Sequence, residues 1–193
     1  MSQNTGLDLH YFTWSERPDL MAQAWRLRHQ RLIDKRGWSL ESRRMLEIDR
    51  YDSTARHCAV TVDELLIGYA RGNPTDRPHL LGDCFSNLLP ARDRPCSPRI
   101  WEVSRFVFDP AYLRTTRVLA ALIDGAMAMG PRVAAQAFVA VVEPWMERAV
   151  ARRGYAPERL SPPRVVGYSE GRPVWAHVAF IDLTTARVAG RAA

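Results

Sequence analysis

The chain has 193 residues, of which 47% are hydrophobic and 25% are charged, as in ordinary soluble globular proteins. No apolar run reaches the roughly 18 residues of a membrane-spanning helix, and no signal peptide is visible at the N-terminus. The net charge is +6, and arginine carries most of the positive charge because Lys35 is the only lysine. No nucleic-acid-binding motif accompanies this charge, and the three cysteines are scattered without metal-ligand spacing. We therefore expect a cytoplasmic protein with no membrane span, no nucleic-acid partner and no metal.

Strands and helices are predicted to alternate in the first half of the chain. We expect a strand near 7–14 and then a helix from about Pro18 to Lys35, which Ser15 caps and Gly37 ends. Residues 57–71 predict a hairpin that turns at Asp63-Glu64.

The second half continues the alternation. A proline-rich loop over 73–99 holds a short helix near Leu80, and a strand follows over 100–108. We then expect the following elements: a helix over about 115–129 that stops at Gly130-Pro131, a strand over 133–142, a helix from Pro144 to Gly154, and a hairpin over 165–181.

These elements predict an α/β fold with a central mixed sheet of about seven strands and helices on both faces. The strand–helix–strand unit at 100–142 is expected to form a right-handed parallel crossover. At this length one domain is the default, so we predict a single domain over 1–193 with a frayed tail at 184–193.

Polar residues interrupt the otherwise apolar strand at 100–108. Glu102, Ser104 and Arg105 lie in its middle, and burying unpaired ions costs several kcal/mol each. This strand therefore either lines a functional site or contains a satisfied internal ion pair. On a regular strand Glu102, Ser104 and Phe106 share one face and Arg105 points away, unless a bulge or splay redirects it.

An acidic segment, Glu47-x-Asp49-x-Tyr51-Asp52, lies upstream of this strand. Its aspartates suit the cationic parts of a ligand, although aspartates also brace loops.

Together these motifs resemble the acyl-homoserine-lactone synthases, the autoinducer synthases of bacterial quorum sensing. The resemblance spans about residues 25–155, and its elements in order are Arg28, Trp38, Glu47-x-Asp49-x-Tyr51-Asp52, Gly68-x-x-Arg71, Phe85, Trp101-Glu102-x-Ser104-Arg105-Phe106, and Met146-Glu147-Arg148 through Arg153-Gly154-Tyr155. Leu32 departs from the pattern, since the family usually has phenylalanine there.

This resemblance implies a fold similar to the N-acetyltransferase superfamily and a defined reaction. The α-amine of S-adenosyl-L-methionine (SAM) attacks an acyl thioester, and the methionine carboxylate then displaces methylthioadenosine and closes the lactone. SAM is a substrate, so no cofactor is expected.

The resemblance also implies roles for individual residues. The expected catalytic residues are Glu102 as base, Arg105, Ser104 and Asp49. The expected SAM-binding residues are Arg28, Trp38, Asp49, Asp52, Arg71, Phe85 and Arg105. We expect Arg71 to pair with Asp49, Asp52 or Glu102.

The acyl cavity is expected to be lined by Val103, Phe106, Ala140, Val142, Trp145 and Met146. Ala140 offers no hydroxyl for a 3-oxo group, and the bulk of Trp145 favours a short, branched or aromatic acyl chain unless this side chain packs in the core. The acyl donor is expected to be acyl-carrier protein or acyl-CoA. Either donor could bind the arginines of one helix, Arg148, Arg152 and Arg153. Alternatively, these arginines only form the solvent-exposed face of that helix.

Two other functions remain open from the sequence. One is an acetyl-CoA-dependent N-acetyltransferase, although the Gln/Arg-x-x-Gly-x-Gly/Ala loop of those enzymes is absent. The other is a non-catalytic domain that only binds SAM or an acyl carrier.

Overall fold

The computed structural model describes residues 6–112 and 115–185. By its internal contacts the chain divides into two units, Met1–Arg71 with Arg105–Met129, and Gly72–Ser104 with Gly130–Ala193. The single domain over 1–193 stays a prediction. Of the expected frayed tail at 184–193, residues 186–193 lie outside the described part of the chain.

Eight strands are present in the described residues, in the order β1-β2-β3-β4-β5-β8-β6, with β7 paired to β8. The strands are β1 (Asp8–Phe12), β2 (Arg56–Val62), β3 (Leu65–Pro74), β4 (Ile100–Phe108), β5 (Ala137–Val142), β6 (Glu158–Arg159), β7 (Arg164–Ser169) and β8 (Arg172–Asp182). The helices are α1 (Pro18–Arg28), α2 (Leu80–Asp83), α3 (Thr115–Arg132) and α4 (Pro144–Arg152), with a π-helical turn over His29–Asp34 and 3₁₀ turns over Asp52–Thr54, Ser86–Leu88 and Ala91–Asp93. The predicted α/β fold with a mixed sheet is confirmed, with one strand more than expected.

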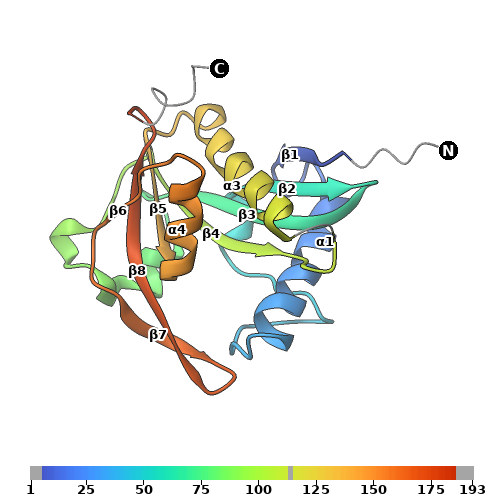
Figure 1. Cartoon of the computed structure of the whole chain (residues 1–193), viewed down its shortest axis with the longest axis horizontal. Coiled ribbons are helices and arrows are strands. Elements are labelled where there is room, and N and C mark those ends of the chain that lie inside the picture. Colours follow the sequence, from blue (N-terminus) through green and yellow to red (C-terminus); the bar gives the residue numbers. More distant parts are fainter. Residues whose placement is uncertain (1–5, 113–114, 186–193) are drawn as a thin grey trace. The chain divides into compact units, whose positions relative to one another are not determined.

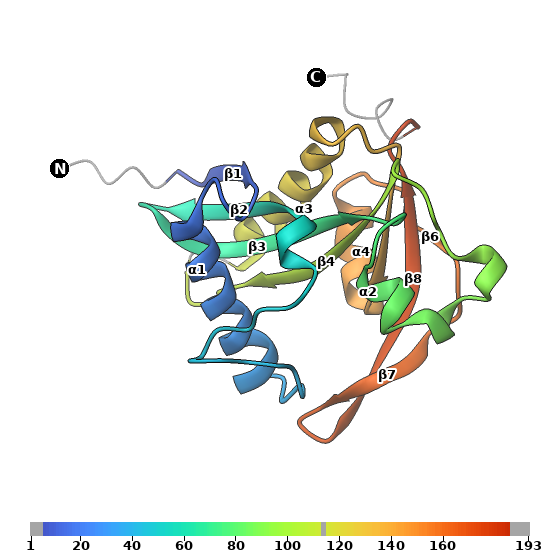
Figure 2. The same ribbon diagram turned by 180° about the vertical axis from the view of Figure 1, so that it is seen from behind.

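In the first unit, α1 and α3 lie on opposite faces of strands β1 to β3 (Figures 1 and 2). Side chains alternate along β2, so Ala59 packs with the buried residues of α1, while Cys58 faces Gly125 of α3. A Cβ at Gly68 of β3 would meet Val118 of α3 at 3.5 Å. The predicted hairpin is confirmed, and its turn at Asp63-Glu64 has positive φ at both residues.

The start and end of α1 differ from the prediction. Its N-cap is Arg17 without a side-chain cap, and the Ser15 hydroxyl lies 3.4 Å from that of Thr13 instead. The α-helix ends at Arg28 and continues as the π-helical turn His29–Asp34, a wider turn that often occurs at functional sites. Gly37 closes the segment with φ of +67°.

In the second unit, β4 runs parallel to β5, and β5 is antiparallel to β8. The parallel pairing between 100 and 142 is therefore confirmed. Helix α4 packs against β8 (Figure 1), and the β7–β8 hairpin turns at Glu170-Gly171.

Two predicted boundaries in this unit were wrong. Helix α3 passes through Gly130-Pro131 and ends at Arg132, since a proline so near the end of a helix disturbs little of it. Strand β5 begins at Ala137, because Ala134 has a φ of +53° and the Ala135 N–H bonds the Gly130 carbonyl at 2.9 Å. Strand β6 has only two residues, which is too short for a sequence pattern to predict it. Among the described residues, no helix is long and apolar enough to cross a bilayer.

Candidate active site

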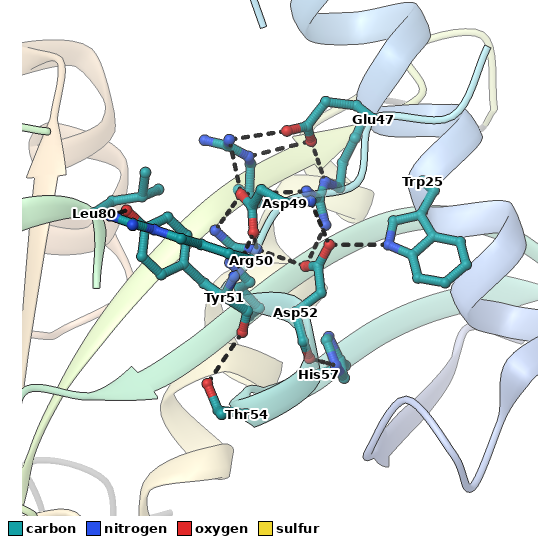
Figure 3. Close-up of polar contacts among 12 residues, drawn as sticks. Trp25, Glu47, Asp49, Arg50, Tyr51, Asp52, Thr54, His57 and Leu80 are labelled. Atoms are coloured by element: carbon teal, nitrogen blue, oxygen red, sulfur yellow. Dashed lines mark hydrogen bonds and ion pairs between the residues drawn. The ribbon is translucent and has the colours of Figure 1, made fainter. Parts of the chain in front are cut away.

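Three carboxylates and three arginines form one ionic network in the first unit (Figure 3). Its members, with the exposed fraction of each side chain, are Arg28 (0%), Glu47 (1%), Asp49 (16%), Asp52 (0%), Arg71 (0%) and Arg105 (9%). Three positive and three negative charges balance, which is the condition for burying so many ions together. The predicted pairing of Arg71 is found with Asp49 and Asp52.

Asp52 is the most deeply held member of the network. Its Oδ1 accepts hydrogen bonds from Nη1 of Arg28 at 2.6 Å and Nη1 of Arg71 at 2.5 Å. Its Oδ2 accepts from the indole N–H of Trp25 at 3.0 Å and the backbone N–H of Asp49 at 3.1 Å. These four donors occupy the four lone-pair sites of a carboxylate. Burial alone would raise the pKa of Asp52, but Arg28 and Arg71 outweigh it and lower that pKa to about 2.

Glu47 connects the network to α1 and to β4. It accepts from Nε of Arg28 at 2.5 Å, and from Nε and Nη2 of Arg105 at 3.2 and 2.9 Å. Its own backbone N–H donates to the carbonyl of Trp25 at 3.1 Å. The sequence analysis placed Glu47 in the acidic motif but gave it no role. Its position as first acid of that motif was the available signal.

Asp49 lies at the most exposed point of the network. Arg71 donates to both of its oxygens, at 2.5 and 2.7 Å, and Arg105 donates to Oδ2 at 2.9 Å. Burial raises the pKa of Asp49, but these arginines have the larger effect and lower it. Oδ1 also accepts the Tyr51 N–H at 3.0 Å, so this aspartate braces its own loop as well as pairing with arginine.

Further buried polar side chains support Asp52 through its backbone carbonyl, which His57 contacts (Figure 3). The Nε2 of His57 lies 3.1 Å from the carbonyl oxygen of Asp52, and Nδ1 lies 2.7 Å from the Tyr69 hydroxyl. A carbonyl can only accept, so Nε2 carries the proton and Tyr69 donates to Nδ1. Burial is the main cause that lowers the pKa of His57 to about 4, so this ring is neutral near pH 7. Sequence reasoning missed Trp25, His57 and Tyr69, and no spacing pattern marks them.

Arg105 reaches the network because β4 is irregular at this residue. Its φ is +53°, a left-handed conformation that is uncommon outside glycine. Arg105 is expected to join a site only if a bulge or splay redirects it, and this positive φ is a local irregularity of that kind.

Glu102, in the second unit, is held by backbone donors. It is 2% exposed, and its Oε2 and Oε1 accept the N–H groups of Leu80 and Leu81 at 2.8 and 2.6 Å. The predicted short helix near Leu80 thus has a defined task, because its first turn orients this carboxylate.

The two aromatic side chains that are predicted to bind SAM lie in different units, Trp38 in the first and Phe85 in the second. Trp38 packs against the apolar cluster around α1, with the Arg36 guanidinium 5.0 Å from its ring. Phe85 packs against the cluster that contains Leu81 and Leu88. Ser104 is half-buried.

The predicted acyl-cavity residues also fall in both units. Phe106 belongs to the first unit, and the second unit holds Val103, Ala140, Val142, Trp145 and Met146. Trp145 is 38% exposed, so it is not a core side chain. The cavity itself stays a prediction. The three arginines of and after α4, Arg148, Arg152 and Arg153, are all exposed.

Residues 12–171 match the protein family described as autoinducer synthase. The chain belongs to this family. It is an enzyme of quorum-sensing signal synthesis, and the resemblance read from the sequence is confirmed. An acyl-homoserine-lactone synthase from Acinetobacter nosocomialis is 33% identical over 153 residues, which cover 74% of this chain and 84% of that protein.

Solved structures show the same fold. The acyl-homoserine-lactone synthase LasI gives a TM-score of 0.82 at 24% identity, covering 93% of this chain and 91% of LasI. The CoA-dependent synthase BjaI, with SAM and isopentyl-CoA, gives 0.80 at 23% identity, with coverages of 92% and 84%. An N-acetyltransferase from Lactobacillus plantarum gives 0.61 at 16% identity, with coverages of 92% and 99%. The predicted similarity to the N-acetyltransferase fold is therefore confirmed.

Proposed function

We propose that this autoinducer synthase makes an N-acyl-L-homoserine lactone from SAM and an acyl thioester. The SAM α-amine attacks the thioester carbonyl, the amide forms, and the carrier thiol leaves with a proton. The SAM carboxylate then displaces methylthioadenosine from its own γ-carbon, which closes the lactone ring. The proposed reaction takes place in the cytoplasm, where SAM and acyl thioesters are made, and needs no cofactor.

The observation that carries this proposal is the uneven exposure of the ionic network. Four of its six side chains are exposed by 1% or less, whereas Asp49 and Arg105 are exposed by 16% and 9%. A carboxylate and a guanidinium side by side match the cationic and anionic ends of SAM. Arg105 would donate hydrogen bonds to the SAM carboxylate, and Asp49 would hold the ammonium or sulfonium.

The buried members then serve the exposed pair. With four donors already on its carboxylate, Asp52 has no capacity for a ligand, and Arg28 is wholly buried. We therefore assign Asp52, Arg28 and Arg71 to SAM binding through the orientation of Asp49 and Arg105, not through direct contact.

Glu102 is the proposed base. A free α-amine has a pKa of about 7.7–8.0, so removing its proton near pH 7 costs only about 1 kcal/mol. A carboxylate acting through a water molecule is sufficient for that step, and such help is worth roughly 10²–10⁴ in rate. Ser104 is proposed to contact SAM or the backbone, and the backbone N–H groups around Arg105 and Phe106 to stabilise the thioester oxyanion.

The acyl donor is proposed to be acyl-carrier protein or acyl-CoA. BjaI, a CoA-dependent relative in fold, has been solved with isopentyl-CoA. The exposed arginines at 148, 152 and 153 would suit either an acidic carrier or the phosphates of CoA. A short, branched or aromatic acyl group fits the bulk of Trp145.

Mass spectrometry of the enzyme incubated with SAM and a panel of acyl-CoA and acyl-carrier thioesters tests the proposal. We expect an N-acyl-homoserine lactone together with methylthioadenosine. Thioester consumption without methylthioadenosine would indicate an N-acetyltransferase instead. SAM binding with no product from any thioester would mean either that the panel lacks the true acyl donor or that the domain only binds SAM.

Glu102→Gln tests the base. We expect turnover to fall at least about tenfold while SAM binding is largely kept. Glu41→Gln, at an exposed position, is the matched control and should behave as wild type. Unchanged turnover in Glu102→Gln would remove this residue as the base.

A further inference from the structure

The turn that holds Glu102 has an unusual first residue. His79 is the N-cap of α2, yet its side chain caps nothing in that helix. Its Nδ1 lies 2.7 Å from the carbonyl oxygen of Arg77 instead. Since a carbonyl only accepts, Nδ1 carries the proton and donates it backward along the chain.

The His79 ring is also fixed from its other side. It is 6% exposed and packs over Gly82, where an added Cβ would lie 3.0 Å from Cε1 and 3.2 Å from Nε2. Glycine at this position leaves room for the ring to approach the backbone this closely. The imidazole is therefore held between the Arg77 carbonyl and the Gly82 backbone.

Because the His79 side chain points away from α2, another group accepts the hydrogen bonds of the first backbone N–H groups of this helix. An N-cap serine, threonine, asparagine or aspartate usually accepts the N–H two or three residues ahead. Because His79 turns away, its side chain does not compete for the Leu81 N–H, which donates to Glu102 of β4 at 2.6 Å, next to the Leu80 N–H at 2.8 Å. The carboxylate replaces the missing cap, and each of its oxygens accepts one of these N–H groups.

We propose that His79 is a positioning residue for Glu102, because it fixes the turn whose Leu80 and Leu81 N–H groups bind that carboxylate and leaves the Leu81 N–H uncontested. This inference rests on the proposed function, in which Glu102 acts as the base. A catalytic group must be held close to its productive position, and small displacements cost up to about a hundredfold in rate.

His79→Ser is the most direct test. Serine is a good N-cap, so its hydroxyl would compete with Glu102 for the Leu81 N–H while it stabilises the first turn of α2. We expect kcat to fall about tenfold, with KM for SAM and the melting temperature close to wild type. His79→Phe keeps an aromatic ring, although a larger one, and removes the Nδ1 donor, and a similar fall in kcat is expected. Arg77→Ala is the matched control, because that side chain is exposed and only its backbone carbonyl takes part.

A double-mutant cycle separates positioning from simple packing. If His79 acts through Glu102, adding His79→Ser to Glu102→Gln should lower kcat by less than about twofold further. A full additional tenfold loss, or a loss of melting temperature with kcat unchanged, would overturn the inference. So would wild-type kcat in both His79 variants while Glu102→Gln is impaired. If Glu102→Gln itself keeps wild-type turnover, the base assignment fails and the inference fails with it.

Gly82→Ala supplies an independent check. The new Cβ would push the His79 ring, so kcat should fall about threefold in the wild-type background. In the His79→Ser background the ring is absent, and the same substitution should have no further effect. An equal loss in both backgrounds would contradict the proposed contact.

Discussion

Asp52 and Asp49 are both aspartates of the acidic motif, yet replacing each by asparagine should disturb the protein differently. Asp52→Asn leaves Arg28 and Arg71 buried with one negative charge fewer, and it turns an amide NH₂ toward groups that also donate. Asp49→Asn makes the same chemical change at a side chain that is 16% exposed. The first variant should therefore lose stability, and the second should lose affinity for SAM.

The magnitudes follow from burial. Removing one partner from a buried ion pair costs about 3–5 kcal/mol. For a chain of this size, 1 kcal/mol corresponds to about 2–4 °C, so Asp52→Asn should melt about 6–20 °C lower. Asp49→Asn removes a charge-assisted hydrogen bond to SAM, which is worth about 1.5–3 kcal/mol. The Kd for SAM should therefore rise about tenfold to hundredfold.

Thermal unfolding followed by circular dichroism and calorimetric titration with SAM measure the two effects. Both measurements are made on both variants, with Glu41→Gln as the exposed control. A melting temperature of Asp52→Asn within about 2 °C of wild type would contradict the structural role of Asp52. Wild-type affinity of Asp49→Asn for SAM would contradict the binding role of Asp49.

Three further predictions concern aromatic side chains and His57. The pKa of His57 is lowered, mainly by burial, to about 4, so the unfolded chain binds more protons between pH 6.5 and 4. Urea titrations should therefore give an unfolding free energy that is lower at pH 4.5 than at pH 7 by up to about 3 kcal/mol. His57→Gln should reduce this difference between the two pH values. An unchanged difference would exclude His57 as its source. Trp25→Phe removes the indole donor to Asp52 together with part of a buried ring and should cost at least about 1.5–3 kcal/mol in the same titration, whereas Trp14→Phe, at a side chain that is 36% exposed, should cost less. Trp145→Ala should widen acyl tolerance in the product assay with little change in melting temperature, because this side chain is 38% exposed; an identical acyl profile would place it outside the acyl cavity.

The order of helices and strands could be predicted from the sequence because it depends on local patterns of residues. Short runs rich in apolar residues marked β2, β3 and β8, and the two residues Asp63-Glu64 marked a tight turn. The errors occurred where local preference was overridden. Pro131 is a helix breaker, but α3 ends one residue later, so the break has little left to disrupt. Ser15 is a good cap residue, but the helix begins three residues further on.

The site followed from the sequence only in part, and the physical reason is burial. The motif residues of the ionic network carry charge, and a run of charge in an apolar context is visible in a sequence. A buried tryptophan or histidine such as Trp25 or His57 is not distinguishable from a core residue until its partner is known. His79 is hidden for a related reason, since its contacts are with a backbone carbonyl and a glycine, which have no side-chain signature.

The geometry of the network explains why arginine, and not lysine, fills its positive positions. Arg71 gives two nitrogens to the two oxygens of Asp49, and Arg105 gives Nε and Nη2 to Glu47 while Nη2 also reaches Asp49. A guanidinium offers five donors in one plane, whereas an ammonium is a single point charge. A lysine at either position would thus leave carboxylate oxygens without donors in a buried site. The scarcity of lysine in the whole chain does not account for these positions, because bidentate pairing demands arginine here whatever the composition elsewhere.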